Sequence, residues 1–227
     1  MKKTILGILA CSLAFSVQAE TIDISGNNTS SAYVSYNNSI SLAASKTVDV
    51  KMARYCYFSS AITGGGTLNL YAGGERCYLG TAKGAAWPNW TNYTGDIHVY
   101  PFKENSSSAG FFGVVLAHGG KSSAPDNALA DVKSGKVNTS MANNRVVLHE
   151  GATICCEANT SGAGFRIGEL QTEKGSTLQG YMKTKRSAYY LVGGLGTNAT
   201  LAGTIAPSGY NDETALGLVK EGRGNYR

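Results

Sequence analysis

The chain of 227 residues is poor in proline, in charge and in cysteine, with 4 prolines, 15% charged residues and 5 cysteines. The 20 basic and 15 acidic residues are spread along the chain, which argues against the clustered basic face of a nucleic-acid-binding protein. Long runs of Leu, Glu, Lys and Ala at helical spacing are also lacking, which argues against a helical fold. Disorder is disfavoured too, because 42% of the residues are hydrophobic and 13 are tyrosines.

Long apolar runs are confined to the first nineteen residues. Lys2 and Lys3 precede an apolar stretch from Ile5 to Phe15, and Val17-Gln18-Ala19 provides a small-residue cleavage signal. The apolar run is too short to span a membrane. A lipoprotein signal ending at Cys11 would leave an unusually short leader. Residues 1–19 are therefore predicted to be a bacterial secretory signal peptide, and residues 20–227 one exported domain without a transmembrane helix.

Glycine is abundant, with 29 residues, and it separates short runs in which apolar and polar residues alternate. Such runs predict many short strands joined by tight turns, hence an all-β fold. Similar runs recur along the chain at intervals of 20 to 25 residues. Val48 and Val50 are followed by Leu68 and Leu70 at an offset of 20, the segment 167–170 by 192–195 at 25, and the segment 177–180 by 200–203 at 23. Periods in the low twenties predict a parallel β-solenoid, whose stacked turns bury a continuous apolar interior.

The segment from Lys103 to Asn143 breaks this rhythm. It is rich in Ser, Ala and Asn around one apolar stretch, 111–117. We interpret it as irregular turns of the solenoid with loops projecting from one face, where binding is usually found.

The dipeptide Cys-Tyr occurs twice, at Cys56-Tyr57 and Cys77-Tyr78, 21 residues apart. If 21 residues make one turn, the two cysteines are neighbours on parallel strands ~4.8 Å apart. A disulfide tolerates Cα separations of ~4.4–6.8 Å, and export makes oxidation accessible. The alternative is a stack of two buried thiols, and both interpretations place the tyrosines in a stack on the opposite face. A zinc site has little support, because no Cys-x-x-Cys motif or suitably spaced His accompanies the pair.

Two other groups of residues are candidates for special roles. Trp87, Trp90 and Tyr93 place three aromatic rings among amides in one loop, which suits contact with a sugar. Alternatively, the tryptophans pack under the turn and close the solenoid. Cys155 and Cys156 are adjacent, so in a strand one thiol is expected to point inward and the other to lie near the surface.

Several segments resemble one family of exported proteins. GGGTLNLYAG (64–73), NYTGDIHV (92–99) and RVVLHEGATI (145–154) are similar to autotransporter-associated β-strand repeats, the passenger repeats of bacterial surface proteins. The resemblance implies a right-handed, single-stranded parallel β-helix of the pectate-lyase-like superfold, serving as an adhesin or surface scaffold. The ending, 216–227, resembles the opening of another repeat, and no translocator barrel follows it. Attachment to the outer membrane would therefore require a missing C-terminal segment.

Enzymatic function has weaker support in the sequence. Glycoside hydrolysis needs two carboxylates beside the scissile bond, and the only adjacent acidic pair is Asp212-Glu213. Asp96, Glu75 and Glu150 lie near expected strands and could converge as in a polysaccharide lyase, but no motif requires it. The three histidines belong to no catalytic motif; His98 is expected to point outward from a strand.

We therefore expect a non-catalytic surface or secreted scaffold, adhesin-like, that contacts surface glycans or other cell-surface proteins. No catalytic residue, metal site or cofactor is predicted. A carbohydrate-active β-helix enzyme, or a fragment of one, is the first alternative, and a purely structural segment of a larger assembly is the second.

Overall fold

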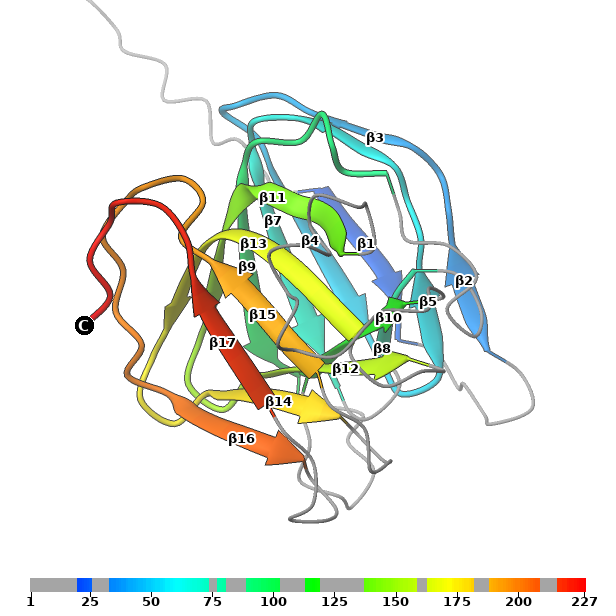
Figure 1. Cartoon of the computed structure of the whole chain (residues 1–227). Coiled ribbons are helices and arrows are strands. Elements are labelled where there is room, and N and C mark those ends of the chain that lie inside the picture. Colours follow the sequence, from blue (N-terminus) through cyan, green and yellow to red (C-terminus); the bar gives the residue numbers. More distant parts are fainter. Residues whose placement is uncertain are drawn as a thin grey trace, which may run out of the picture.

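The computed structural model describes residues 20–25, 33–73, 77–80, 89–102, 113–118, 137–158, 163–181, 188–208 and 216–227. All regular elements in these ranges are strands, as the alternating sequence predicts (Figure 1). An eight-stranded sheet has the order β1 (Glu20–Ile24), β4 (Thr47–Met52), β7 (Thr67–Ala72), β9 (Asp96–Pro101), β11 (Asn138–Leu148), β13 (Ala163–Thr172), β15 (Ala188–Val192), β17 (Leu216–Lys220).

A second sheet of seven strands has the order β16 (Thr204–Ser208), β14 (Thr177–Tyr181), β12 (Thr153–Ala158), β10 (Gly113–His118), β8 (Cys77–Leu79), β5 (Cys56–Phe58), β2 (Val34–Tyr36). The short strands β3 (Ile40–Leu42) and β6 (Ile62–Gly64) form a third sheet. Every pair of these strands is parallel. Between β4 and β7, for example, Val48 lies beside Leu68 and Val50 beside Leu70. The chain thus returns repeatedly to the same sheets, and each return adds one strand.

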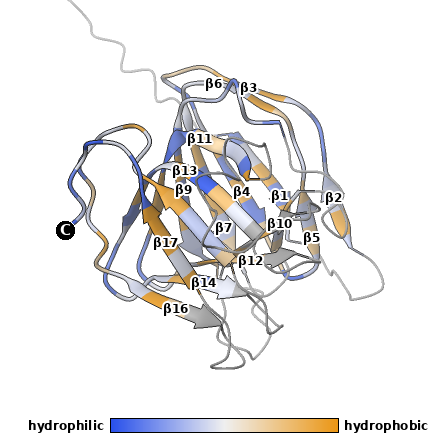
Figure 2. Ribbon diagram, viewed as in Figure 1, coloured by the Kyte–Doolittle hydropathy of each residue, from blue (hydrophilic) through white to orange (hydrophobic). Residues whose placement is uncertain are grey.

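Alternation along the strands builds the interior. In β4, Val48, Val50 and Met52 are buried while the residues between them are partly exposed, and β7 repeats this pattern. Side chains from both large sheets join one hydrophobic cluster that runs from Ile22 to Val192. Figure 2 shows the matching alternation of hydrophobic and hydrophilic residues along the ribbons.

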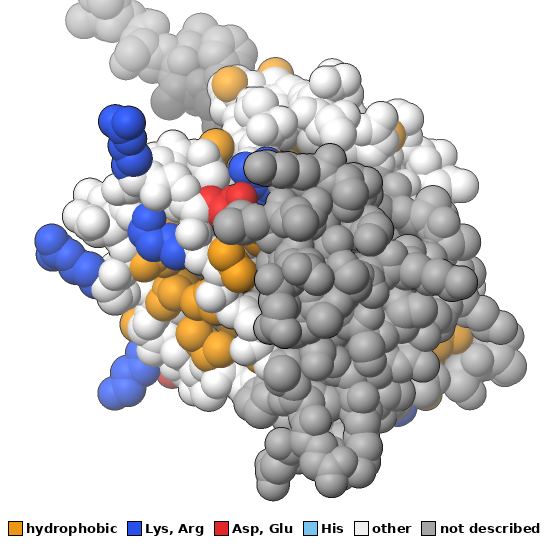
Figure 3. All heavy atoms as spheres, viewed as in Figure 1, with side chains coloured by type: hydrophobic (Ala, Val, Ile, Leu, Met, Phe, Trp, Pro, Cys, Tyr) orange, Lys and Arg blue, Asp and Glu red, His pale blue; other side chains and the backbone are white. Residues whose placement is uncertain are grey.

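The last strands of the two large sheets leave part of this interior uncovered. Leu218 of β17 lies beside buried Tyr190, and Ile205 of β16 beside buried Leu178, yet both are exposed. Among the described residues no further strand pairs with β16 or β17. Figure 3 shows hydrophobic side chains reaching the surface around β17.

One predicted repeat pairing is wrong. The segment 177–180 pairs with 204–206 rather than with 200–203, because Thr177 lies beside Thr204 and Leu178 beside Ile205. Leu201 instead forms a bridge to Thr172, in the connection that precedes β16. The physical reason is a longer turn after β15, which carries the Thr-Leu motif away from the seven-stranded sheet.

The segment 103–143 interrupts the regular spacing, as predicted. Asp96 of β9 pairs with Arg145 of β11, 49 positions later, and Cys77 of β8 pairs with Val114 of β10. Most of the residues between these strands lie outside the described ranges.

Candidate functional site

Four titratable side chains that the sequence did not connect lie together on the outward face of the eight-stranded sheet. Alternation in β9 buries Ile97 and Val99 and turns His98 and Tyr100 outward. The next strand, β11, ends at Leu148, and His149 follows it beside Tyr100. Glu173 occupies the corresponding position after β13. We call His98, Tyr100, His149 and Glu173 the histidine cluster.

Two hydrogen bonds connect His98, His149 and Glu173 of the histidine cluster. The Nδ1 atom of His149 lies 3.0 Å from Oε1 of Glu173, and its Nε2 atom lies 2.9 Å from Nδ1 of His98. A carboxylate only accepts, so the Nδ1–H of His149 donates to Glu173 and Nε2 carries the lone pair. That lone pair accepts the Nδ1–H of His98. The carboxylate therefore fixes the tautomers of both rings.

Tyr100 supports the ring of His149 from one side. The two ring centroids are 4.0 Å apart and the planes differ by 4°, which is a close face-to-face stack. Tyr71 of β7 stacks on Tyr100 at 5.0 Å in turn. His98 lacks such close support, because its centroid is 6.2 Å from that of Tyr100. His149 is thus the fixed ring and His98 the freer one.

Burial and the neighbouring imidazole of His149 both lower the pKa of His98, burial being the larger cause. Asp96 and Glu173 oppose this shift, but the net direction is downward from 6.5. His98 is therefore predominantly neutral at pH 7. A neutral ring suits the hydrogen bond to His149, since two imidazolium rings at this separation would repel.

The lowered pKa of His98 predicts that stability falls in acid. Below about pH 6.5 the unfolded chain binds a proton that folded His98 resists, so the free energy of unfolding decreases as the pH falls. We expect His98→Asn, which keeps a donor for His149, to lose less stability than the wild type between pH 7 and pH 5. Urea denaturation at both pH values checks this. Equal losses in the two proteins would contradict it.

A second group of charges lies on the same strands, level with the first residue of β9. Arg145 lies between Asp96, at 3.7 Å, and Glu169, at 3.0 Å, and also donates to Gln171 at 2.7 Å. Glu169 is buried and accepts a further hydrogen bond from Thr197. Nearer the N-terminus, Asn69 donates to Asp49 at 2.8 Å. These side chains pair with one another from strand to strand.

Of the acidic residues that suggested a lyase, the two in the described ranges, Asp96 and Glu150, are not brought together. Asp96 lies beside Arg145 of β11, whereas Glu150 follows Arg145 by five residues and lies in the turn after that strand. Glu75 lies outside the described residues, as do Asp212 and Glu213. The side chain of His118 also lies outside them. Of the two remaining histidines, His98 points outward as expected.

The repeated Cys-Tyr pairs confirm the predicted register. Cys56 lies directly beside Cys77 and Tyr57 beside Tyr78, whose rings stack at 5.2 Å. Both cysteines are buried free thiols in the structure, and each donates to the carbonyl oxygen of Ala53 at 3.0 Å. Burial and the contact with Cys77 raise the pKa of Cys56. The stacked-thiol interpretation describes this arrangement, and the disulfide stays a prediction for mass spectrometry.

The glycan-contacting interpretation of the aromatic loop is wrong for Trp90 and Tyr93. Both side chains are fully buried, so neither ring offers a face to a sugar. Trp90 packs near Phe58 and donates from Nε1 to the carbonyl oxygen of Ser60 at 2.8 Å. The Tyr93 hydroxyl lies 2.9 Å from the carbonyl oxygen of Gly66 and 2.8 Å from that of Asp96. The two rings close the interior, and Trp87 lies outside the described residues.

The adjacent cysteines also differ from expectation. Cys156 points into the main core, whereas Cys155 packs on the other side of the seven-stranded sheet with Tyr57 and Tyr78. Cys155 is nevertheless fully buried rather than near the surface. The stacked rings of Tyr57 and Tyr78 pack against Cys155 and explain part of its burial.

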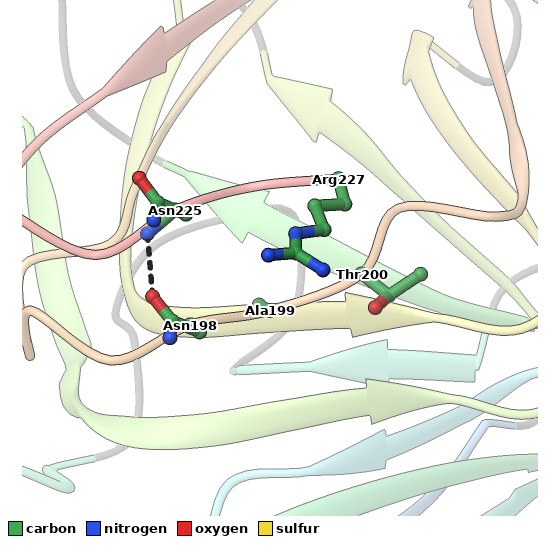
Figure 4. A pocket seen from close by; sticks show the side chains of 5 residues that line it. All are labelled: Asn198, Ala199, Thr200, Asn225 and Arg227. Atoms are coloured by element: carbon green, nitrogen blue, oxygen red, sulfur yellow. Dashed lines mark hydrogen bonds between the residues drawn. The ribbon is translucent and has the colours of Figure 1, made fainter.

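A small polar pocket lies near the C-terminal residues. Its volume is about 230 Å³, and it is lined by Asn198, Ala199, Thr200, Asn225 and Arg227 (Figure 4). The backbone N–H of Asn225 donates to the Asn198 side chain at 2.8 Å. The lining residues include no carboxylate or imidazole side chain for acid–base chemistry.

Within the described ranges, no three His, Cys, Asp or Glu side chains form a group suited to a metal ion. In the same ranges, no helix is long and apolar enough to cross a membrane.

Comparison with known proteins adds no relative. No family model matches the chain, and no curated protein matches it. The resemblance to passenger repeats therefore stays an expectation.

Proposed function

We propose that the chain is an exported surface scaffold, adhesin-like and without catalytic activity of its own. The long parallel sheets support a right-handed parallel β-helix as the finer description of the fold. The predicted secretory leader at residues 1–19 and the resemblance to passenger repeats are the reasons to place the protein at the bacterial surface or outside the cell. Other cell-surface proteins or glycans are its expected partners.

One observation carries the proposal. Polar side chains on the outward face of the eight-stranded sheet are paired across neighbouring strands, as Asp49 with Asn69 and Arg145 with Glu169. Such pairing fixes the side chains in one arrangement and suits a stable surface of regular shape. A lyase would instead need acidic groups free to hold calcium beside a basic residue, and Arg145 is engaged by two carboxylates.

The experiment separates a scaffold from a carbohydrate-active enzyme. We expect the purified protein to produce no new ultraviolet absorbance with pectin or alginate, with or without calcium. Binding to immobilised glycans or to intact cells is measured in parallel. Lyase activity that disappears in Asp96→Asn or Arg145→Gln would overturn the proposal in favour of the enzyme.

A further inference from the structure

The apolar interior of the stacked strands is open at both ends. In the seven-stranded sheet, one inward column of neighbouring residues runs from Val34 of β2 through Cys56, Cys77, Val114, Ile154 and Leu178 to Ile205 of β16. The five inner members are at most 1% exposed, whereas Val34 is 39% exposed and Ile205 is 46% exposed. The column therefore has room for one more strand at each end.

Other incompletely covered core residues lie at the same two ends. Among the described residues, the partly buried hydrophobic side chains that pack against the main cluster are Tyr36 and Ile40 near the first strands, and Leu201, Leu216 and Tyr226 near the last ones. Figure 3 shows hydrophobic side chains at the surface around β17. Solenoid proteins that stay single cover such ends with a polar outer repeat.

The edge strands add main-chain hydrogen-bonding groups to these apolar ends. The strands β1 and β2 begin the two large sheets, and β17 and β16 end them; within the described ranges each pairs with a strand on one side only. The free side of an edge strand offers N–H and C=O groups to another strand. Because the pairings next to both ends are parallel, a further parallel strand would continue either sheet with the same geometry.

The two ends of the stack carry opposite charge. Residues 20–45 contain two charged side chains, Glu20 and Asp23, which are both acidic and exposed. Among residues 216–227 the exposed charged side chains are all basic: Lys220, Arg223 and Arg227. The one acidic residue of that segment, Glu221, accepts a hydrogen bond from Arg166 at 2.7 Å. These charges favour contact between unlike ends and disfavour contact between like ends.

We propose that the N-terminal end of a second copy of this chain docks on the C-terminal end of the first. Val34 of the second copy then lies beside Ile205 of the first, and the acidic strand β1 faces the basic segment 216–227. The contact uses a different surface on each molecule, so each pair keeps one free end of each kind. Copies therefore assemble head to tail into open rows. This inference goes beyond the scaffold function and does not depend on it.

Two substitutions that each block one end test the contact. Val34→Asp places a charge in the N-terminal surface and Ile205→Asp places one in the C-terminal surface, both at positions exposed in the single molecule. In sedimentation velocity, the mass of the wild type should rise with concentration past that of two chains, while each variant alone stays a monomer. An equimolar mixture of the two variants should form dimers and stop there, since each contributes its intact end. Thr91→Asp adds the same charge at an exposed turn between the ends and should assemble like the wild type.

A wild type that stays monomeric or stops at a dimer would overturn the proposal, as would a mixture of the variants that stays monomeric. Dimers of one variant alone would indicate contact between like ends and contradict it too. Circular dichroism shows whether each variant is folded. If Ile205→Asp does not fold, Leu218→Asp on β17 replaces it. If Val34→Asp does not fold, Glu20→Lys with Asp23→Lys replaces it and should weaken association about 10-fold; an unchanged association constant would count against the proposal.

Discussion

Replacing Trp90 with Ala is expected to destabilise the protein by about 3–5 kcal/mol. The side chain is fully buried, packs near Phe58 and Tyr93, and donates a hydrogen bond to the carbonyl oxygen of Ser60. Its removal leaves a cavity and an unpaired carbonyl group in the interior. The midpoint of urea denaturation, followed by circular dichroism, measures the loss.

Two further variants isolate the causes. Trp90→Phe keeps most of the packing but loses the hydrogen bond, and we expect it to cost about 1–3 kcal/mol. Thr91→Ala changes an exposed neighbour whose hydroxyl donates to the Asn89 side chain, so the change should remain within about 0.5 kcal/mol. If Trp90→Ala were as mild as Thr91→Ala, the ring would not be buried, and the loop would again be available to a glycan.

Replacing Gly64 with Ala is the second change with a large expected effect, about 3 kcal/mol or more. Gly64 ends β6 with φ of +99°, a region that L side chains rarely adopt. An added Cβ would also overlap the carbonyl oxygen of Leu42, on the neighbouring strand β3. The substitution therefore strains the backbone and separates two stacked strands.

Gly196→Ala is the matched control for Gly64→Ala. Gly196 also has a positive φ, +72°, but an added Cβ would meet nothing within 4 Å. We expect only the conformational cost there, about 1–2 kcal/mol. The difference between the two urea midpoints reports the close approach of β3 and β6. Equal midpoints would mean that this approach does not exist in solution.

The sequence predicts the stacking best where the repeat has no insertion. Twenty residues separate Val48 from Leu68 and twenty-one separate Cys56 from Cys77, and both pairs are direct neighbours. Hydrophobic alternation and a constant period fix the register together there, because a slip of one residue would turn every apolar side chain outward.

The sequence does not predict the register of two neighbouring strands where the connection between strands changes length. The runs starting at Thr200 and Thr204 both begin with Thr and a branched apolar residue, so both fit the strand β14. The run with the higher identity to β14, at Thr200, is not its partner, since the turn after β15 is longer than the corresponding turns after β11 and β13. Local pattern alone cannot measure the length of a turn.

The histidine cluster was missed for a related reason. His149 and Glu173 are 24 residues apart, one regular interval, and this pairing could have been found from the period. His98 and His149 are separated by 51 residues that include the irregular segment, so no period relates them. Burial of Trp90 was one of the two interpretations that the sequence left open, but its hydrogen-bond partner Ser60, 30 residues earlier in another connection, could not be predicted from the period.

The central claim is that successive returns of the chain stack as parallel neighbours in one fixed register. Asp49 and Asn69 are Cα partners on the outward face of β4 and β7, so Asp49→Cys with Asn69→Cys places two thiols on strands ~4.8 Å apart. A disulfide accepts that separation. Asp49→Cys with His98→Cys is the control, because β9 is two strands away, about 9.6 Å. After mild oxidation, peptide mass mapping should find the bond between positions 49 and 69 and none between 49 and 98; the opposite result would contradict the parallel register and the account built on it.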